Sequence, residues 1–318
     1  MESIANLVKR RLGKTFFEYA IDPFVSGVYA GDPAKLVTRF ALPKMHVLEQ
    51  KYGSFIRGAI QLNKLPKTEA EKKVTKHVFS TPGGFGRLAE VLTQAIGLEN
   101  IYLNCGPIQL TSKNEDWTVE LSDQAIAIKT KKVLSTVPGY ALPRFLSFAN
   151  KQDVDLIANM PYAPVVQVGV GIRELSEKIP MAFGGLIPSC ENKNILGILF
   201  PSSCFPNRAP KDAATLAFFM GGRRHPELLD WSDAEICTDV KNALVEMLGF
   251  PKDYEPAAIQ IFRHARAIPQ YEADSEARLA AIERIQAAHP GLILAGGIRD
   301  GIGLGDRIKQ ATLLALQA

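Results

Sequence analysis

The hydrophobic period of the chain changes near residue 100, and this change constrains the fold more than any other feature of the sequence. Residues 1–78 carry apolar residues at the three- and four-residue spacing of amphipathic helices, whereas later segments alternate apolar and polar residues as strands do. Helical patterns return at 232–248 and 274–288. This interleaving of helices and strands predicts a fold of the α/β or α+β class.

Short apolar runs predict where the strands lie. We expect strands over residues 101–103, 108–110, 117–121, 133–137, 165–172, 195–200, 215–220, 258–262 and 292–295. The polar cluster Asn114-Glu115-Asp116 separates two of them and predicts a hairpin turn. The Lys-rich run over 67–76 predicts a solvated connector after the helical segment.

A chain of 318 residues is long enough for about two domains. With 47% hydrophobic and 22% charged residues it has the composition of a folded globular protein, which excludes a disordered, collagenous or coiled-coil chain. The net charge is only +4, and the basic residues are scattered apart from short clusters such as Arg223-Arg224. We therefore expect no nucleic-acid-binding surface.

The four cysteines, at positions 105, 190, 204 and 237, are widely spaced and form no CxxC pair, which predicts reduced thiols and a cytoplasmic location. No stretch approaches 18 consecutive apolar residues, and the start of the chain lacks the profile of a signal peptide. We expect a protein that is neither exported nor membrane-spanning, and association with a membrane surface stays open.

A glycine-rich loop near the C-terminus is the strongest single indication of a binding site. The predicted strand 292–295 leads into residues 296–305, which contain five glycines, and then into a helix expected to reach Gln317. Bare backbone N–H groups at the start of a helix approach an anionic or carbonyl oxygen closely. A tight turn with close packing explains the glycines equally well, so both interpretations stay open.

Other motifs give weaker signals. The letters Gly84-x-Gly86-x-x-Ala89 match a dinucleotide fingerprint, but no clean strand precedes them, so we expect a helix start there. The pair Gly169-x-Gly171 lies within a strand pattern and favours a bulge or a close backbone approach. His264 is retained as a candidate because it lies in an expected loop over 262–271. Metal-ligand spacing and a GxSxG motif are both absent, so we predict neither a metal site nor a catalytic nucleophile.

Four segments follow one another in a characteristic order. They are 23–33 (PFVSGVYAGDP), 81–92, 183–210, and the pair 267–271 and 295–305. Together they resemble the protoporphyrinogen oxidase family, the oxygen-dependent flavoenzymes of haem synthesis, and the similarity runs nearly from end to end of the chain. Members of that family begin with a βαβ unit that carries GxGxxG, which this chain lacks. The resemblance therefore implies a fragment, an internal start or half of a split gene.

The resemblance implies an α/β (α+β) fold, namely the C-terminal portion of an FAD-binding fold of the amine-oxidase type with a substrate sheet and a helical domain. The implied domains are a helical, membrane-surface-type domain over 1–78, part of the FAD-binding domain over 79–160, a substrate-binding sheet over 161–255 and the C-terminal part of the FAD-binding domain over 256–318.

The resemblance also implies roles for single residues. Ile108, Ile302, Gly303 and Leu304 match positions that face FAD, and His264 stands where many members have a tryptophan near the flavin. No side chain is identified as catalytic.

Leu186 and Phe200 match apolar residues that sandwich the porphyrinogen ring in the family, and Val170 is a further candidate for the apolar wall. The substrate's propionates require a cation. The unranked candidates for that cation are Arg57, Arg173 and Arg208.

The implied reaction is the oxidation of protoporphyrinogen IX to protoporphyrin IX by hydride transfer to FAD, with dioxygen as the final acceptor. Three alternatives stay open. They are coproporphyrinogen III oxidation by the same fold, another amine-oxidase-like dehydrogenase, against which segment 205–210 argues, and a non-catalytic porphyrin-binding fragment that needs a separate N-terminal half. A homodimer and peripheral contact with a membrane are further expectations.

Overall fold

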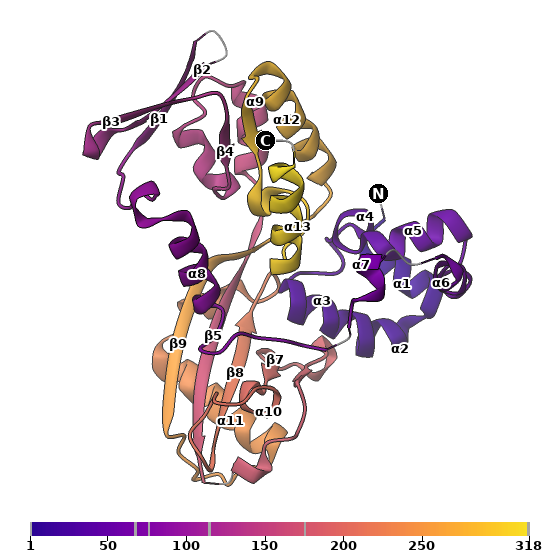
Figure 1. The fold of residues 1–318 in the computed structure, drawn as a ribbon. Helices are drawn as coiled ribbons and strands as arrows, with labels where there is room; N and C mark the ends of the chain where they lie inside the picture. Colours follow the sequence, from indigo (N-terminus) through magenta and orange to yellow (C-terminus); the bar gives the residue numbers. More distant parts are fainter. Residues whose placement is uncertain (1, 67–68, 76, 114–115, 175, 317–318) are drawn as a thin grey trace. The chain divides into compact units, whose positions relative to one another are not determined.

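The computed structural model describes residues 2–66, 69–75, 77–113, 116–174 and 176–316, and the chain folds into two compact units (Figure 1). Unit 1 combines Met1–Phe55 with Pro161–Ala273, and unit 2 combines Ile56–Met160 with Asp274–Ala318. Each unit is therefore discontinuous in sequence. The expected boundaries at 78 and 255 do not coincide with these limits, and the functional labels given to the four expected segments stay predictions.

The first part of unit 1 is helical, as its hydrophobic period predicts. Its helices are α1 (Ile4–Leu12), α2 (Lys14–Phe16), the π-helical η1 (Phe17–Ile21), α3 (Asp22–Tyr29), α4 (Thr38–Ala41) and α5 (Pro43–Tyr52), and α6 (Phe55–Lys64) starts at its end. Ser3 caps α1, because its hydroxyl accepts a hydrogen bond from the backbone N–H of Asn6 at 3.2 Å. Gly53 adopts the left-handed conformation (φ 65°) and ends α5, so the helical pattern over 45–62 is divided between two helices.

A five-stranded antiparallel sheet of order β6-β7-β8-β5-β9 forms the rest of unit 1. Its strands are β5 (Tyr162–Arg173), β6 (Gly184–Leu186), β7 (Ile195–Leu199), β8 (Ala213–Gly221) and β9 (Ala258–Pro269). Short helices η5 (Ser176–Lys178), η6 (Ser189–Glu191), α10 (Pro201–Cys204) and η7 (Pro226–Asp230) lie between them.

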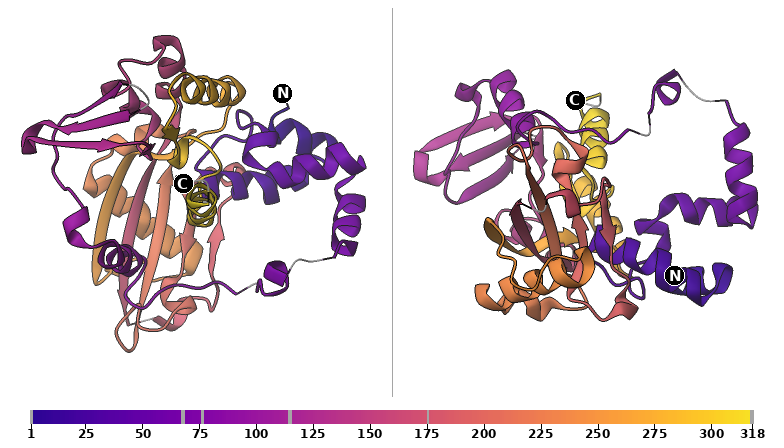
Figure 2. Two further views of the ribbon diagram at one scale, coloured as in Figure 1. Left: turned by 45° about the horizontal axis from the view of Figure 1, so that its top comes forward. Right: turned by 90° about the horizontal axis from the view of Figure 1, so that it is seen from below.

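One face of this sheet is covered by helix α11 (Asp233–Leu248), which lies against the strands in Figures 1 and 2. A capping box of Ser232 and Glu235 starts the helix, and Gly249, in the left-handed conformation, ends it. Alternate residues of the strands point into this core. Its members from β5 and α11 are Val166, Val168, Val170, Ile172, Ile236, Val240, Ala243 and Leu244.

The opposite face of the sheet, which we call the second face, meets the end of α3. Ala30 packs there against Ala163 and Val165 of β5. Gln270 is fully buried and donates a hydrogen bond to the carbonyl of Tyr29 at 2.9 Å. Gly31 allows this close approach, because a Cβ there would lie 2.6 Å from the Gln270 side-chain oxygen and would force that side chain to shift. These contacts attach the N-terminal helices to the sheet within unit 1.

Unit 2 contains two small sheets. Strands β1 (Ile108–Lys113), β2 (Asp116–Leu121) and β3 (Ile126–Thr130) form an antiparallel meander, whereas β4 (Val133–Ser135) and β10 (Leu292–Leu294) form a parallel pair. The helices are α7 (Glu69–Lys72), α8 (Gly86–Ile96), α9 (Lys151–Ala158), α12 (Ser275–Ala288) and α13 (Leu304–Ala315), with η2 (Leu98–Asn100), η3 (Ser122–Gln124), η4 (Gly139–Arg144) and η8 (Gly296–Ile298).

Most of the expected elements of unit 2 are confirmed, including the helix that starts at Gly86. Residues 101–103 form no strand, however, and β3 and α9 were not expected. The pairing of β1 with β2 confirms a hairpin. The expected turn residues Asn114 and Glu115, the expected helix end at Gln317 and parts of the expected connector (67–68 and 76) lie outside the described residues.

The four cysteines are free thiols, as expected. In the described ranges, no helix is long and apolar enough to cross a membrane. The same residues contain no group of three or more His, Cys, Asp or Glu side chains that could hold a metal ion.

Candidate substrate and cofactor sites

The second face of the sheet carries large apolar side chains beside a few polar ones and forms a candidate binding surface in unit 1. Gln167 of β5 lies on this face, because its neighbours along the strand belong to the α11 core. Antiparallel partners share a face, so Phe219 of β8 and Phe262 of β9, which both pair with Gln167, lie there too. Phe262 is 42% exposed.

The glycine pair of β5 also lies on the second face. Gly169 and Gly171 pair with Gln260 and Ala258 of β9 in regular register, so the expected bulge is not at the glycines. The irregularity in this pairing falls between Ala163 and Val165 instead. A Cβ on Gly171 would lie 3.4 Å from the Ala258 Cβ, which is ordinary contact, so β9 does not by itself require the glycine.

Leu186, expected as a wall of the substrate site, lies on the second face at the β6 edge. It pairs with Gly197 of β7, which in turn pairs with Phe219. A Cβ on Gly197 would lie 2.9 Å from the Leu186 side chain, so this glycine makes room for it. Leu186 keeps 42% of its surface exposed and is placed to contact a ligand.

Val170 and Phe200, the other two expected wall residues, lie elsewhere. Both belong to the core between the sheet and α11, with exposed fractions of 1% and 5%. Side chains packed against α11 have no surface left for a substrate, so we replace these two candidates by Phe219. Side chains alternate between the two faces along β5, so Val170 points to the α11 core and its neighbour Gly171 lies on the second face.

His264 lies within β9 rather than in a loop. Its backbone pairs with Val165, so the expected loop over 262–271 is corrected to strand as far as Pro269. The mixed polar composition of this segment reflects an edge strand whose outer edge is unpaired in the sheet. His264 shares the second face with Val165 and is exposed, and its role beside a flavin stays a prediction.

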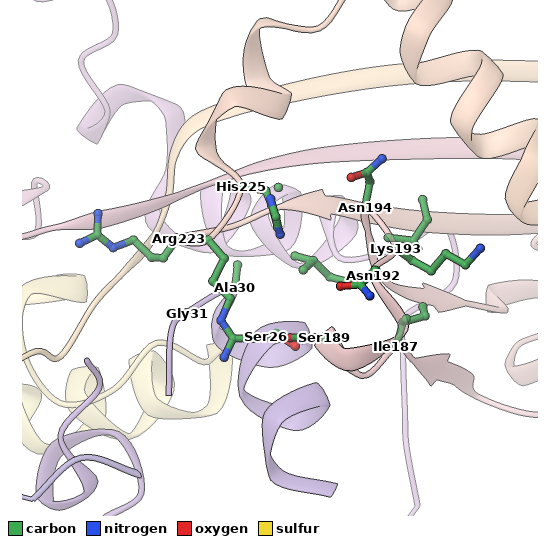
Figure 3. A pocket seen from close by; sticks show the side chains of 14 residues that line it. Ser26, Ala30, Gly31, Ile187, Ser189, Asn192, Lys193, Asn194, Arg223 and His225 are labelled. Atoms are coloured by element: carbon green, nitrogen blue, oxygen red, sulfur yellow. Dashed lines mark hydrogen bonds between the residues drawn. The ribbon is translucent and has the colours of Figure 1, made fainter. Parts of the chain in front are cut away.

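A cavity of about 150 Å³ lies within unit 1 where three connections meet (Figure 3). Its walls come from the end of α3, from the connection between β6 and β7, and from the turn after β8. In Figure 3 the side chains of His225 and Asn192 lie between Arg223 and Lys193, whose charged ends extend outward on opposite sides. Leu196 lines the cavity and also packs with Phe219 on the second face.

Beside this cavity, the buried carboxylate of Asp22 in α3 forms an ion pair with Arg224, which is partly exposed. Their side chains approach to 2.6 Å, and Asp22 also accepts the backbone N–H of Ser189 at 3.0 Å. Burial alone raises the pKa of Asp22, which is 3% exposed, but the hydrogen bonds from Arg224 and Ser189 outweigh it and hold the pKa below its ordinary value. Asp22 is therefore charged at neutral pH.

The expected flavin-facing residues Ile302, Gly303 and Leu304 lie at the start of α13 in unit 2. The N–H of Gly303 donates to Asp306 at 3.0 Å, which caps this helix. Gly296, earlier in the same loop, is left-handed (φ 82°), and a Cβ there would lie 2.8 Å from the carbonyl of Thr136. Close packing therefore explains this glycine, because the absence of a side chain allows the loop to lie directly on the end of β4.

The loop is suitably placed for one side of a nucleotide cofactor. It follows the carboxyl end of β10 beside that of β4, and ligands of parallel α/β sheets bind at such ends. The hydroxyl of Ser135, the last residue of β4, is buried and has no hydrogen-bond partner in the described part of the chain, so a ligand atom would satisfy it. Ile108, the remaining expected contact, is half-buried at the first position of β1.

The sequence did not indicate that Phe219 lies on the second face or that Leu196, Asn192 and His225 line one cavity. Phe219 was inside an expected strand, and the face it occupies follows only from the pairing of β8 with β5 and β7. The cavity residues come from separate connections, although the Arg223-Arg224 cluster was visible in the sequence.

A parallel strand pair that leads into a glycine-rich turn, together with a separate antiparallel sheet, makes this a mixed α/β chain with a turn suited to a nucleotide cofactor. Residues 1–299 match the family described as flavin containing amine oxidoreductase, and the chain belongs to this family. It is 31% identical to protoporphyrinogen oxidase 1 of Arabidopsis thaliana (chloroplastic) over 335 residues, which cover 99% of this chain and 62% of that protein.

Two further relatives are informative. Coproporphyrinogen III oxidase of Bacillus subtilis (strain 168) is 25% identical, with 97% of this chain and 65% of that protein covered. The crystal structure of a protein from Exiguobacterium sp. 255-15, provisionally named a protoporphyrinogen oxidase, has the same fold, with a TM-score of 0.79, 22% identity, and coverage of 99% of this chain and 66% of that one. The chain thus spans about three fifths of the length of the plant relative.

Proposed function

We propose that this chain provides the substrate sheet and part of the flavin site of a porphyrinogen oxidase that converts protoporphyrinogen IX to protoporphyrin IX. The observation that carries the proposal is the 31% identity with the plant protoporphyrinogen oxidase over 99% of the chain. The apolar second face, with Leu186 and Phe219 in one row, supports a flat and largely apolar substrate.

FAD bound here would supply the hydride acceptor for a methylene bridge of the substrate; in repeated rounds an N–H proton would leave to solvent with each hydride, and dioxygen would take up the electrons and be released as hydrogen peroxide. The side chains of this chain then bind and orient the ring. Leu186 and Phe219 exclude water from one side of the ring, and Ile302, Gly303 and Leu304 at the start of α13 contact the cofactor. No group of the chain needs to act as a general acid or base in this proposal.

A second candidate is coproporphyrinogen III oxidation, which the 25% identity with the Bacillus subtilis enzyme over 97% of the chain favours. The two substrates differ in the number of carboxylates they carry. Groups that bind carboxylates therefore distinguish the two functions, whereas the apolar second face suits both.

We expect Phe219→Ala to weaken the binding of protoporphyrin IX, the product, by about tenfold, because the loss of one aromatic contact costs about 1–1.5 kcal/mol. The measurement is a titration followed by the Soret band, with circular dichroism to establish that each variant is folded. Phe24→Ala, the same change on the exposed surface of α3, is the matched control. Equal affinities for the two variants, or no porphyrin binding by the parent chain, would contradict the proposal.

A separate polypeptide or segment that supplies the missing nucleotide-binding strands is a further part of the proposal. The parallel sheet of unit 2 has only two strands among the described residues, and parallel sheets are normally covered on both faces. Large apolar side chains of unit 2 are about half exposed on β4, on α13, which follows β10 in the chain, and on α8. They include Leu92 and Ile96 of α8, Leu134 of β4 and Ile308 of α13, with exposed fractions of 53%, 55%, 52% and 55%.

We therefore expect the chain alone to lose added FAD on desalting, because the pyrophosphate-binding GxGxxG segment is not in it. Co-expression with the GxGxxG-bearing N-terminal portion of a relative should yield a yellow complex with flavin absorbance. The absorption spectrum after gel filtration shows whether the lone chain has lost its flavin and whether the co-expressed complex has kept it. A lone chain that stays yellow would contradict this part of the proposal and leave the porphyrinogen reaction in place.

A homodimer and a cytoplasmic location are further parts of the proposal.

Peripheral contact with a membrane is the last part of the proposal, and exposed apolar side chains along α2, η1 and α3 support it. They are Phe16, Tyr19, Phe24 and Val28, with exposed fractions of 46%, 59%, 40% and 43%. Co-sedimentation with lipid vesicles would detect the contact, and its absence at high lipid concentration would remove it from the proposal.

A further inference from the structure

One row of residues crosses all five strands of the sheet on its second face. In the pairing register, Leu186 of β6 lies opposite Gly197 of β7, Gly197 opposite Phe219 of β8, Phe219 opposite Gln167 of β5, and Gln167 opposite Phe262 of β9. We call these five residues the cross-strand row. Because β8, β5 and β9 lie side by side (Figure 1), the polar side chain of Gln167 stands between two aromatic residues.

The amide of Gln167 is not used to hold the fold together. Its side chain is partly buried, and no hydrogen bond joins it to another described residue. Water serves this amide while the second face is open. A ligand that covers the cross-strand row removes that water, and the loss of a hydrogen bond costs affinity unless the ligand supplies a partner at the same point.

The backbone beside Gln167 leaves room for a ring to approach the amide. The next residue of β5 on the second face is Gly169, and a Cβ placed there would meet only the backbone carbonyl of Gln260, 3.9 Å away. The partner of Gly169 on β8 is Ala217, which is also small. No tall side chain of β5 or β8 on this side of the row therefore lifts a ring away from Gln167.

The spacing of the aromatic residues places the centre of a tetrapyrrole over Gln167. Neighbouring strands lie about 4.8 Å apart, so Phe219 and Phe262, two strands apart, are separated by about 10 Å at the backbone. A tetrapyrrole ring that contacts both side chains spans this distance. Its four nitrogen atoms surround its centre, so they lie above the amide, whereas the apolar rim lies on the aromatic residues.

The reduced and the oxidised macrocycle differ in what they offer to an acceptor beneath the ring. In a porphyrinogen the saturated methylene bridges let each pyrrole tilt, so that its N–H points to one face. In a porphyrin conjugation keeps the ring flat, and the two remaining N–H groups point to the centre within the plane. Hydrogen bonds weaken steeply below an angle of about 120°, so an oxygen under the ring accepts well from the porphyrinogen and poorly from the porphyrin.

We propose that the side-chain oxygen of Gln167 accepts a pyrrole N–H of the bound porphyrinogen and makes the second face selective for the reduced macrocycle over the aromatic product. This role rests on the proposed function and adds a residue that determines its specificity. A surface with a polar group that must be paired rejects a ligand that cannot pair it. Oxidation of the ring therefore weakens its binding and favours release of the product.

The role of Gln167 is independent of the carboxylates of the substrate. None of the three arginines expected to meet the propionates belongs to the cross-strand row. Arg57 lies in α6, Arg173 ends β5, and the guanidinium of Arg208 lies 5.8 Å from the centre of the Phe205 ring. Gln167 recognises the macrocycle, which both candidate substrates share.

The test is Gln167→Met, which keeps the length of the side chain and removes its amide. Gln167→Glu keeps an oxygen acceptor and removes the N–H donors. Gln50→Met, the same change at an exposed position of α5 in the same unit, is the matched control. Coproporphyrinogen III and coproporphyrin III, which carry the same carboxylates, are titrated into each chain under nitrogen and without FAD by isothermal calorimetry, and circular dichroism establishes that each variant is folded.

We expect the parent chain and Gln50→Met to bind the porphyrinogen more tightly than the porphyrin. Gln167→Met should weaken the porphyrinogen about tenfold, the effect of one lost hydrogen bond. The same variant should bind the porphyrin as tightly as the parent chain or more tightly, because no amide loses its water under the flat ring. Gln167→Glu should keep the preference for the porphyrinogen.

The pair of probes separates this role from the proposed function. Equal affinities of the parent chain for both rings, an equal loss of both in Gln167→Met, or no loss of either would overturn the selectivity while the porphyrin-binding function stands. Loss of the preference in Gln167→Glu would overturn the assignment of the oxygen as the acceptor. If neither ring binds the parent chain, the proposed function and the role of Gln167 fail together.

Discussion

Replacing Arg224 by alanine lowers the free energy of unfolding of unit 1 by about 2–4 kcal/mol, because it leaves the charge of Asp22 buried without its main partner. Asp22 is 3% exposed and lies 2.6 Å from Arg224. The lower end of the range applies because the Arg224 side chain is itself 27% exposed, so water compensates part of the loss. Urea unfolding followed by fluorescence measures the effect, since Trp231 packs on the core of this unit.

The pH dependence of this pair has a definite sign. The pKa of Asp22 is lower in the folded chain than in the unfolded one, so the pair stabilises the fold above the unfolded pKa of about 4. That contribution is lost as the pH falls through the lower, folded pKa. The stability difference between the parent chain and Arg224→Ala should therefore shrink in acid.

An exposed ion pair in the same unit provides the control for this experiment. Lys241 and Glu255 approach to 2.6 Å, but their side chains are 37% and 72% exposed. Lys241→Ala should cost less than about 1 kcal/mol. Equal losses in Lys241→Ala and Arg224→Ala would mean that burial of Asp22 is not what makes its partner important.

Trp117→Ala should destabilise unit 2 by about 3–5 kcal/mol, the range for removal of a large buried aromatic side chain. Trp117 of β2 is fully buried, its ring lies 5.5 Å from that of Phe148, and its N–H donates to the carbonyl of Pro290 at 2.9 Å. It therefore links the meander to the segment that enters β10. Thermal unfolding followed by circular dichroism measures the loss.

Trp117→Phe separates the ring from the hydrogen bond. The smaller aromatic ring keeps much of the packing against Phe148 but leaves the Pro290 carbonyl without this donor, so we expect about 1–2 kcal/mol. If the alanine variant were no less stable than the phenylalanine variant, packing of this ring would not hold the two sheets of unit 2 together.

Helix capping and hydrophobic periodicity in the sequence predict most helices and strands. Which side chains lie on the second face depends instead on how the strands pair. The helix after Ser232 and the strand around Val165 to Ile172 follow from capping and periodicity alone. The segment around His264 has too many polar residues to indicate a strand by itself, and it is extended because β5 supplies its hydrogen bonds.

The candidate site shows the same limit more sharply. Leu186, expected from its motif, lies on the second face, whereas Phe200 and Val170 are buried in the core against α11. For Val170 a shift of one residue along β5 reverses the face. The cavity of unit 1 joins the end of α3 to connections more than 150 residues later in the chain, as the contact of Asp22 with Ser189 shows at a separation of 167 residues. No pattern within a single segment could indicate it.

The discontinuity of both units has a consequence for how the chain folds. The helices within Met1–Phe55 complete their packing only after Pro161–Ala273 has been synthesised, since β5 and the end of α3 share one cluster and Gln270 joins them. Closing loops of this length is slow, because the entropy lost in closure precedes the contacts that compensate for it. The first helices share a small core of their own, but the end of α3 with Ala30 stays without its cover from β5 for much of translation, and this exposed end adds to the risk of aggregation in that interval.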